Sequence, residues 1–134
     1  MNPRFLFDTH IIVRWVSDPK KLSREQSRTI RDSLRRHAPV AVSAMTLLEI
    51  AVLFDERKGR RGVPVAEILN QLDSHPGFLI LPLTVEVATE VVALGPSWRD
   101  RGYRAIVATA RVNGLRLITS DQRIIESGLV PVVC

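Results

Sequence analysis

Short, uninterrupted apolar runs alternate along the chain with segments in which apolar residues recur at helical spacing. The runs are typical of strands buried on both faces, and they predict strands at residues 4–8, 40–42, 78–81, 116–119 and 130–133. The segments between them predict helices at residues 10–16, 23–37, 43–57, 64–74, 85–94, 103–112 and 121–126. This alternation predicts an α/β fold, an α/β/α sandwich around a central, mostly parallel sheet, as a single domain over residues 1–134.

Residues that can begin helices support these boundaries. Ser23, with Gln26 three residues later, matches a capping box, and Ser43 can cap the next helix. Either Ser120 or Asp121 can cap the last short helix. The helix after Ser43 is apolar nearly all round in its first turns, which predicts that it is deeply packed. The helix after Ser23 has only a thin apolar stripe, so much of it should face water or a partner.

Three acidic residues interrupt or end apolar segments. Asp8 ends the first strand, Glu49 lies within the apolar helix after residue 43, and Asp121 follows the fourth strand. A carboxylate in apolar surroundings loses hydration, which is costly unless a cation such as a hard divalent metal compensates. Because parallel strands end at one edge of a sheet, Asp8 and Asp121 should lie at the same edge, with Glu49 about 9 Å along a helix that begins there. The alternatives are that Asp8 and Asp121 only cap helices and that Glu49 points to solvent.

The charge distribution adds a second indication. The net charge is +5, and 46% of the 134 residues are hydrophobic, enough for one packed core. The basic residues fall into three groups, within residues 14–36, 57–61 and 99–123, and no Lys or Arg lies between Gly62 and Trp98. This asymmetry is compatible with a polyanionic partner, either nucleic acid or an acidic protein segment, and equally with a solvated basic face.

Other classes of protein are disfavoured. The single cysteine, Cys134, excludes an internal disulfide and fits the cytoplasm, and neither a membrane-spanning stretch nor a secretion signal is expected. His10, His37 and His75 lack the spacing of metal ligands and are expected to be structural or surface residues. The sequence has no phosphate-binding loop and no nucleophile-elbow serine. A helix-turn-helix around residues 23–37 would need a second, base-reading helix, which the pattern does not indicate.

Three segments in order resemble the PIN-domain family, specifically the VapC-type toxins of bacterial and archaeal toxin–antitoxin pairs. They are Phe-Leu-Phe-Asp-Thr-His at residues 5–10, Val-Ser-Ala-Met-Thr-Leu-Leu-Glu-Ile at residues 42–50, and the stretch at residues 104–121 that ends in Leu-Ile-Thr-Ser-Asp. The resemblance covers nearly the whole chain. It implies an α/β/α fold, a metal-dependent endoribonuclease activity with Mg²⁺ or Mn²⁺, an RNA substrate, inhibition by a cognate antitoxin protein, and a homodimer.

The resemblance also implies roles for particular residues. Asp8 would be the central metal ligand, and Glu49 and Asp121 would bind the metal directly or through water. Thr119 would position a water or a phosphate oxygen, and Arg104 would steady a site carboxylate or the scissile phosphate. The cation would lower the pKa of a water and neutralise the phosphate during in-line attack. The basic groups would supply affinity for RNA that falls as salt rises.

The chain departs from the family at one position. The family pattern Asp-x-x-Asp-Arg reads Asp-Arg-Gly-Tyr-Arg here from residue 100, so Asp100 matches the first acid and Tyr103 replaces the second, a principal metal ligand. A neutral phenol supplies no negative charge at pH 7. Three consequences stay open: Asp100 substitutes as a ligand; the metal binds weakly through Asp8, Glu49 and Asp121; or the protein is a catalytically degenerate PIN module that binds an antitoxin-like protein or RNA without cleavage. Weakened or lost metal binding is favoured over full activity.

Overall fold

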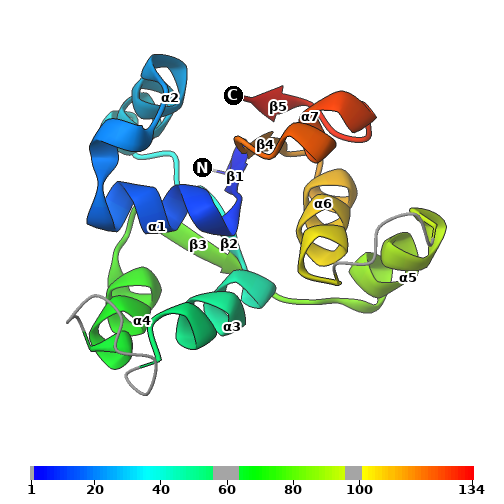
Figure 1. Cartoon of the computed structure of the whole chain (residues 1–134), viewed down its shortest axis with the longest axis horizontal. Coiled ribbons are helices and arrows are strands. Elements are labelled where there is room, and N and C mark those ends of the chain that lie inside the picture. Colours follow the sequence, from blue (N-terminus) through cyan, green and yellow to red (C-terminus); the bar gives the residue numbers. More distant parts are fainter. Residues whose placement is uncertain (1, 56–63, 96–100) are drawn as a thin grey trace.

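A parallel sheet lies at the centre of the computed structural model, which describes residues 2–55, 64–95 and 101–134 (Figure 1). Within these residues the sheet has five strands in the order β3-β2-β1-β4-β5, and every neighbouring pair is parallel. The predicted α/β class with a central parallel sheet is therefore confirmed. The strands are β1 Phe5–Phe7, β2 Val40–Ser43, β3 Phe78–Leu81, β4 Arg116–Ile118 and β5 Val132–Val133.

Helices cover both faces of this sheet (Figure 1). Side chains of α1, α2 and α4 pack on one face, those of α6 and α7 pack on the other, and α5 lies against α6. Each predicted helix is present, and none in the described part of the chain is long and apolar enough to cross a membrane. The helices are α1 Thr9–Ser17, α2 Arg24–Arg35, α3 Ala44–Leu53, α4 Val65–Ser74, α5 Val85–Ala93, α6 Arg101–Asn113 and α7 Gln122–Ser127, with a 3₁₀ turn η1 at Pro19–Lys21.

The apolar strand residues fill a core on each side of the sheet. Consecutive residues of a strand point to opposite faces, so Phe7 lies in the core under α1, α2 and α4, whereas Leu6 lies in the core under α6 and α7. Both side chains are fully buried. Each such side chain contributes about 1.5–3 kcal/mol through burial, which holds the end of β1 rigidly in place.

Helix α3 differs from its prediction in two respects. It ends at Leu53, earlier than expected, and its apolar residues are not deeply packed: only Thr46 and Ile50 are buried. Leu48 is 61% exposed and Val52 is 50% exposed. The physical reason is that the neighbouring elements cover only the side of α3 that carries Thr46 and Ile50, whereas Leu48 and Val52 lie one turn apart on an exposed side. The prediction of deep packing was wrong.

The predicted caps are present, and one of them connects to the end of β4. Ser23 Oγ accepts from the Gln26 backbone N–H at 3.0 Å, and Gln26 Oε1 accepts from the Ser23 N–H at 2.9 Å, which confirms the capping box. The buried Gln26 side chain also donates from Nε2 to the Thr119 carbonyl and to Ser120 Oγ. Of the two candidates for the cap of α7, Asp121 takes the role. The hydrogen bonds from Gln26 join α2 to the loop that carries Asp121.

Candidate active site

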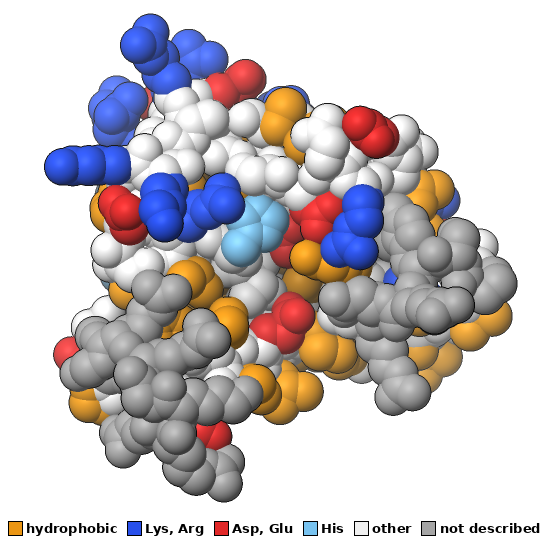
Figure 2. Space-filling model, in the orientation of Figure 1, with side chains coloured by type: hydrophobic (Ala, Val, Ile, Leu, Met, Phe, Trp, Pro, Cys, Tyr) orange, Lys and Arg blue, Asp and Glu red, His pale blue; other side chains and the backbone are white. Residues whose placement is uncertain are grey.

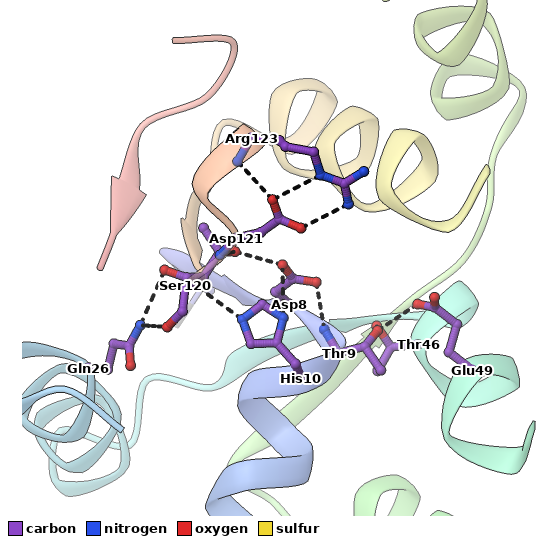
Figure 3. A network of polar contacts seen from close by, with 10 residues as sticks. Asp8, Thr9, His10, Gln26, Thr46, Glu49, Ser120, Asp121 and Arg123 are labelled. Atoms are coloured by element: carbon purple, nitrogen blue, oxygen red, sulfur yellow. Dashed lines mark hydrogen bonds and ion pairs between the residues drawn. The ribbon is translucent and has the colours of Figure 1, made fainter. Parts of the chain in front are cut away.

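The three acids predicted from sequence lie along one edge of the sheet, where β1, β2 and β4 end (Figure 3). Asp8 directly follows β1, and its backbone N–H donates to the Ile118 carbonyl at 3.0 Å, which extends the β1–β4 pairing by one residue. Asp121 follows β4 after Thr119 and Ser120. Glu49 is carried by α3, which begins where β2 ends. The edge therefore gathers residues that are up to 113 positions apart in sequence, as 121 minus 8 gives.

Asp8 is the most deeply buried of these acids, with 1% of its surface exposed. Its Oδ1 accepts from the Thr9 backbone N–H at 2.8 Å, and its Oδ2 accepts from Thr119 Oγ1 at 2.7 Å. Burial raises the pKa of Asp8 above its ordinary value, and Coulomb interaction with His10 and the hydrogen bonds from Thr119 and Thr9 oppose this rise. A buried carboxylate of this kind is one that an added cation would stabilise.

Thr119 connects Asp8 to the loop that carries Asp121. Its fully buried hydroxyl donates to Asp8 and accepts from the Asp121 backbone N–H at 3.0 Å. Since a hydroxyl has a single proton, these two bonds define its orientation. The structure thus places Thr119 between the two acids, where it sets the orientation of the Asp8 carboxylate.

Thr9 connects Asp8 to Glu49: its backbone N–H donates to Asp8, and its hydroxyl contacts Glu49 and Thr46. Thr9 Oγ1 donates to Glu49 Oε1 at 2.6 Å and lies 3.0 Å from Thr46 Oγ1 (Figure 3). Because the Thr9 proton is used on Glu49, the Thr46 hydroxyl must be the donor to Thr9. Glu49 is half-buried, and its carboxylate is turned toward the residue that follows Asp8.

Asp121 has a different environment from Asp8. Its Oδ1 accepts from the Arg123 backbone N–H at 2.9 Å, which caps α7, and Arg123 Nη2 lies 3.2 Å from Oδ2. Hydrogen bonds from Arg123 and Tyr103 lower the pKa of Asp121 and overcome burial, which acts in the opposite direction. Both Asp8 and Asp121 therefore cap helices, as the alternative interpretation held, and the second oxygen of each makes a further contact, with Thr119 and with Arg123 respectively.

Tyr103 lies beside Asp121 and bonds to it. The Arg123 guanidinium carbon lies 4.5 Å from the centre of the Tyr103 ring, and hydrogen bonding with Tyr103 is among the effects that lower the pKa of Asp121. Burial, followed by the interaction with Asp121, raises the pKa of Tyr103 to about 12. The phenol is therefore neutral at pH 7, and this position supplies a hydrogen bond in place of a negative charge.

His10 also belongs to this group of residues, although the sequence pattern indicated only a structural or surface role. Its Nε2 accepts from the Ser120 backbone N–H at 3.0 Å, and its Nδ1 lies 3.4 Å from Asp8 Oδ2 (Figure 3). This arrangement assigns the proton of the neutral ring to Nδ1. Burial lowers the pKa of His10, against the opposing effect of Asp8. The lowered pKa and the hydrogen bond that Nε2 accepts both favour the neutral ring.

Of the two remaining predicted site residues, Arg104 is described and bonds away from these acids, whereas Asp100 is not described. Arg104 donates from Nη2 to the Val91 carbonyl at 3.1 Å, so its hydrogen bond joins α6 to α5 and is not made to a site carboxylate. Its role in steadying a carboxylate or phosphate stays a prediction. Asp100 lies outside the described residues, and its role as a substitute ligand stays a prediction as well.

The donor atoms at this edge suit a hard cation, but the side chains are not drawn together around one point. Carboxylate and hydroxyl oxygens are what Mg²⁺ and Mn²⁺ prefer, and Asp8 and Asp121 are near enough for each to act on the other's charge. Across residues 2–55, 64–95 and 101–134, however, no three His, Cys, Asp or Glu side chains are gathered closely enough to hold a metal ion. Asp8 and Asp121 are therefore candidate ligands with a Coulomb interaction between them, whereas Glu49 is bonded to the Thr9 hydroxyl.

Comparison with known proteins agrees with this architecture. The PIN domain family model matches residues 5–128, and the chain belongs to that family. The chain is 35% identical over 121 residues to "Ribonuclease VapC22" from Mycobacterium tuberculosis, a match that covers 89% of this chain and 88% of the relative. The resemblance to VapC-type proteins drawn from the three segments is therefore confirmed.

Solved structures give the same result for the fold. A toxin–antitoxin complex from Klebsiella pneumoniae contains a chain that is 25% identical, with a TM-score of 0.61 and coverage of 96% of this chain and 95% of that one. The structure of VapBC2 from Rickettsia felis bound to a DNA fragment from its promoter gives a TM-score of 0.68 at 14% identity, covering 98% and 97% of the two chains. At that identity the second likeness concerns the fold alone.

Proposed function

We propose that the chain is the endoribonuclease toxin of a toxin–antitoxin pair and that its active site is the edge built around Asp8. The observation that carries the proposal is the environment of Asp8, 1% exposed and linked through Thr119 to the Asp121 loop and through Thr9 to Glu49. Placing a carboxylate in such a position costs stability, and that cost is typical of active sites. Membership of the PIN-domain family and the similarity to a ribonuclease support it.

The proposed cofactor is Mg²⁺ or Mn²⁺, because PIN-domain VapC ribonucleases generally depend on a divalent metal ion. Asp8 and Asp121 would hold the ion, with Glu49 acting through water. When bound, such an ion neutralises phosphate charge and lowers the pKa of water. The chain itself orients the site: Thr119 holds Asp8, Thr9 holds Glu49, and the neutral His10 stabilises the Asp121 loop through Ser120.

RNA is the proposed substrate because positive charge flanks the acidic edge on two sides. Figure 2 shows Lys and Arg side chains on both sides of Asp and Glu side chains on this face. Arg14 is near enough to His10 for its positive charge to lower the pKa of that residue. Lys20 and Lys21, which are exposed, lie further along the chain in η1. Such side chains hold a phosphate backbone without reading its sequence, and this binding weakens as salt rises.

The proposed partners are an antitoxin protein and a second copy of the chain. Apolar side chains are exposed on α3 and α5, which supports the proposal that a partner protein covers this surface. These side chains are Leu48, Val52, Val85 and Val92. Solved chains of similar fold occur in toxin–antitoxin complexes. We place the protein in the cytoplasm, where its proposed substrate is found and where a single cysteine is compatible with the reducing conditions.

A second candidate function is a PIN module that binds an antitoxin-like protein or RNA without cleaving RNA. Tyr103 favours this alternative, because its neutral hydroxyl stands where the family pattern has a second acid. Fewer negative charges reduce the affinity of a site for a divalent cation. If metal binding is too weak to support cleavage, the remaining function is the binding of an antitoxin-like protein or RNA.

One experiment separates the two candidates. The purified chain, Asp8→Asn and Tyr103→Asp are each incubated with a pool of structured RNAs and Mg²⁺ or Mn²⁺, with and without a chelator. Cleavage by the parent that is lost in Asp8→Asn and with chelator is the expected result. An inactive parent together with active Tyr103→Asp supports the degenerate module. Equal cleavage by the parent and Asp8→Asn would place the activity at another site.

A further inference from the structure

Arg123 holds Asp121 through both carboxylate oxygens. Its backbone N–H donates to Oδ1 at 2.9 Å, its Nε lies 3.4 Å from Oδ1, and its Nη2 lies 3.2 Å from Oδ2 (Figure 3). A guanidinium that engages both oxygens of a carboxylate forms a charge-assisted pair with a defined geometry. The local charge of Asp121 is therefore already balanced within the chain.

Tyr103 stabilises Arg123 in this position. The guanidinium carbon lies 4.5 Å from the ring centre, within the range of a cation–π interaction, and interaction with Tyr103 also lowers the pKa of Asp121. Tyr103 thus contacts both members of the ion pair. The Arg123 side chain is 65% exposed, whereas that of Asp121 is 10% exposed, so Arg123 can move away without disturbing the core.

We propose that Arg123 is a further residue of the active site, a positioning residue whose guanidinium acts as an internal cation at Asp121 and competes there with the divalent ion, and that Tyr103 keeps it in place. The proposal rests on the proposed function, because it concerns the cation of that site. Two positive charges near one carboxylate repel each other, and lone pairs used by Arg123 are not free for a metal. A divalent ion that binds the lone pairs now used by Arg123 must therefore displace its guanidinium from Asp121.

The alternative is that Arg123 forms an ordinary surface ion pair with no influence on metal affinity. Arg116 offers a matched control for this alternative. It is also exposed, its Nη2 donates to the Val132 carbonyl, and its guanidinium carbon lies 5.9 Å from the centre of the Phe5 ring. It lies at the beginning of β4, at the opposite end of the strand from Asp121. Arg116→Gln therefore changes net charge as Arg123→Gln does, far from the acids.

The test measures Mn²⁺ binding to the chain of residues 1–134 by electron paramagnetic resonance of the free ion, after treatment with chelator and dialysis. Arg123→Gln should bind Mn²⁺ about threefold to tenfold more tightly than the parent, the range expected from one exposed ion pair and one cation–π contact. Arg116→Gln should stay within about twofold of the parent. The gain should shrink at high salt, because the competition is between charges.

A second variant tests the role of Tyr103 independently of Arg123→Gln. Tyr103→Leu removes the ring that contacts the Arg123 guanidinium, so it should also tighten Mn²⁺ binding. In the Arg123→Gln background the same change should add less than it does alone, since its effect passes through Arg123. Full additivity would overturn the part of the proposal that concerns Tyr103.

The outcomes distinguish this inference from the proposed function. Mn²⁺ binding that Asp8→Asn abolishes, with Arg123→Gln equal to Arg116→Gln, would overturn the role of Arg123 and leave the metal site standing. Mn²⁺ binding that is absent from the parent and from every variant would overturn both. Circular dichroism of each variant verifies that the fold is retained.

Discussion

The ends of β1 and β4 present the same type of side chain in opposite environments. Asp8 is buried, its hydrogen bonds come from two threonines, and burial raises its pKa. Asp121 is bonded to Arg123 and Tyr103, and its pKa is lowered. Two carboxylates on neighbouring strands therefore differ in whether their charge is already balanced. From this difference we expect that, in the proposed active site, Asp8 is the acid that most needs a cation and Asp121 the one at which Arg123 limits its binding.

The largest expected effect concerns catalysis and would test this division. Asp8→Asn should lower metal-dependent RNA cleavage by on the order of 100-fold or more, because it removes the charge that the chain does not balance. Asp121→Asn should lower it by less, since Arg123 already neutralises that acid. Initial rates on a labelled RNA measure both, and Asp73→Asn, at an exposed position of α4, is the matched control. A greater loss in Asp121→Asn than in Asp8→Asn would reverse the assignment.

The next effect concerns stability. Thr119→Val retains the side-chain shape but removes the hydroxyl that donates to Asp8, so it should cost about 1–3 kcal/mol in the free energy of unfolding. Thr89→Val is the matched control, because the Thr89 hydroxyl is exposed and donates only within α5. Its cost should stay within about 0.5 kcal/mol. Urea unfolding measures both, and equal costs would contradict the importance of the bond between Thr119 and Asp8.

The pH dependence of stability should have opposite signs at the two acids. In the folded state the pKa of Asp8 is raised above its ordinary value of 3.8. The contribution of Asp8 to stability is therefore complete below pH 3.8 and is lost as the pH rises through the raised pKa. Asp121 contributes stability above 3.8, and this contribution is lost as pH falls through its lowered pKa. Relative to the parent, Asp8→Asn should therefore gain stability as pH rises, and Asp121→Asn should lose it.

Urea unfolding in the presence of chelator, from acidic to neutral pH, tests these two slopes. The chelator keeps divalent ions from altering either carboxylate. The same sign for both variants would show that the two environments do not differ as described. Asp73→Asn again serves as the control, since the side chain at position 73 is exposed.

The smallest expected effect concerns Arg123. Because its side chain is largely exposed, Arg123→Gln should lower the free energy of unfolding by less than Thr119→Val does. Urea unfolding at low and high salt measures this, and the difference from the parent should shrink as salt rises. A cost above that of Thr119→Val would mean that the ion pair is a structural element of α7.

The strands and helix caps were predictable because their signals are local. A run such as Phe5–Phe7 is apolar on both faces, and Ser23 with Gln26 forms a box within four residues. The extent to which the surface of α3 is buried was not predictable from local signals. An apolar helix surface shows that burial is favourable, but how much is covered depends on which elements pack against it.

The candidate site shows the same division between local and distant information. The shared edge of Asp8 and Asp121 follows from a parallel sheet alone. The contact between Arg123 and Asp121 spans two positions and could have been read from the sequence as a helix cap followed by a basic residue. The bond from Ser120 to His10 joins residues 110 positions apart, and no local pattern predicts it.

The sequence by itself determined which segments form strands, where helices begin, and that three acids follow strand ends or lie in a helix near them, because these properties depend on neighbours in the chain. Only the tertiary structure decided that threonine hydroxyls join these acids, that His10 lies among them, and that Arg104 turns to α5. Hydrogen bonds act over about 3 Å and depend on direction, so they become defined only when packing has fixed the positions of distant segments.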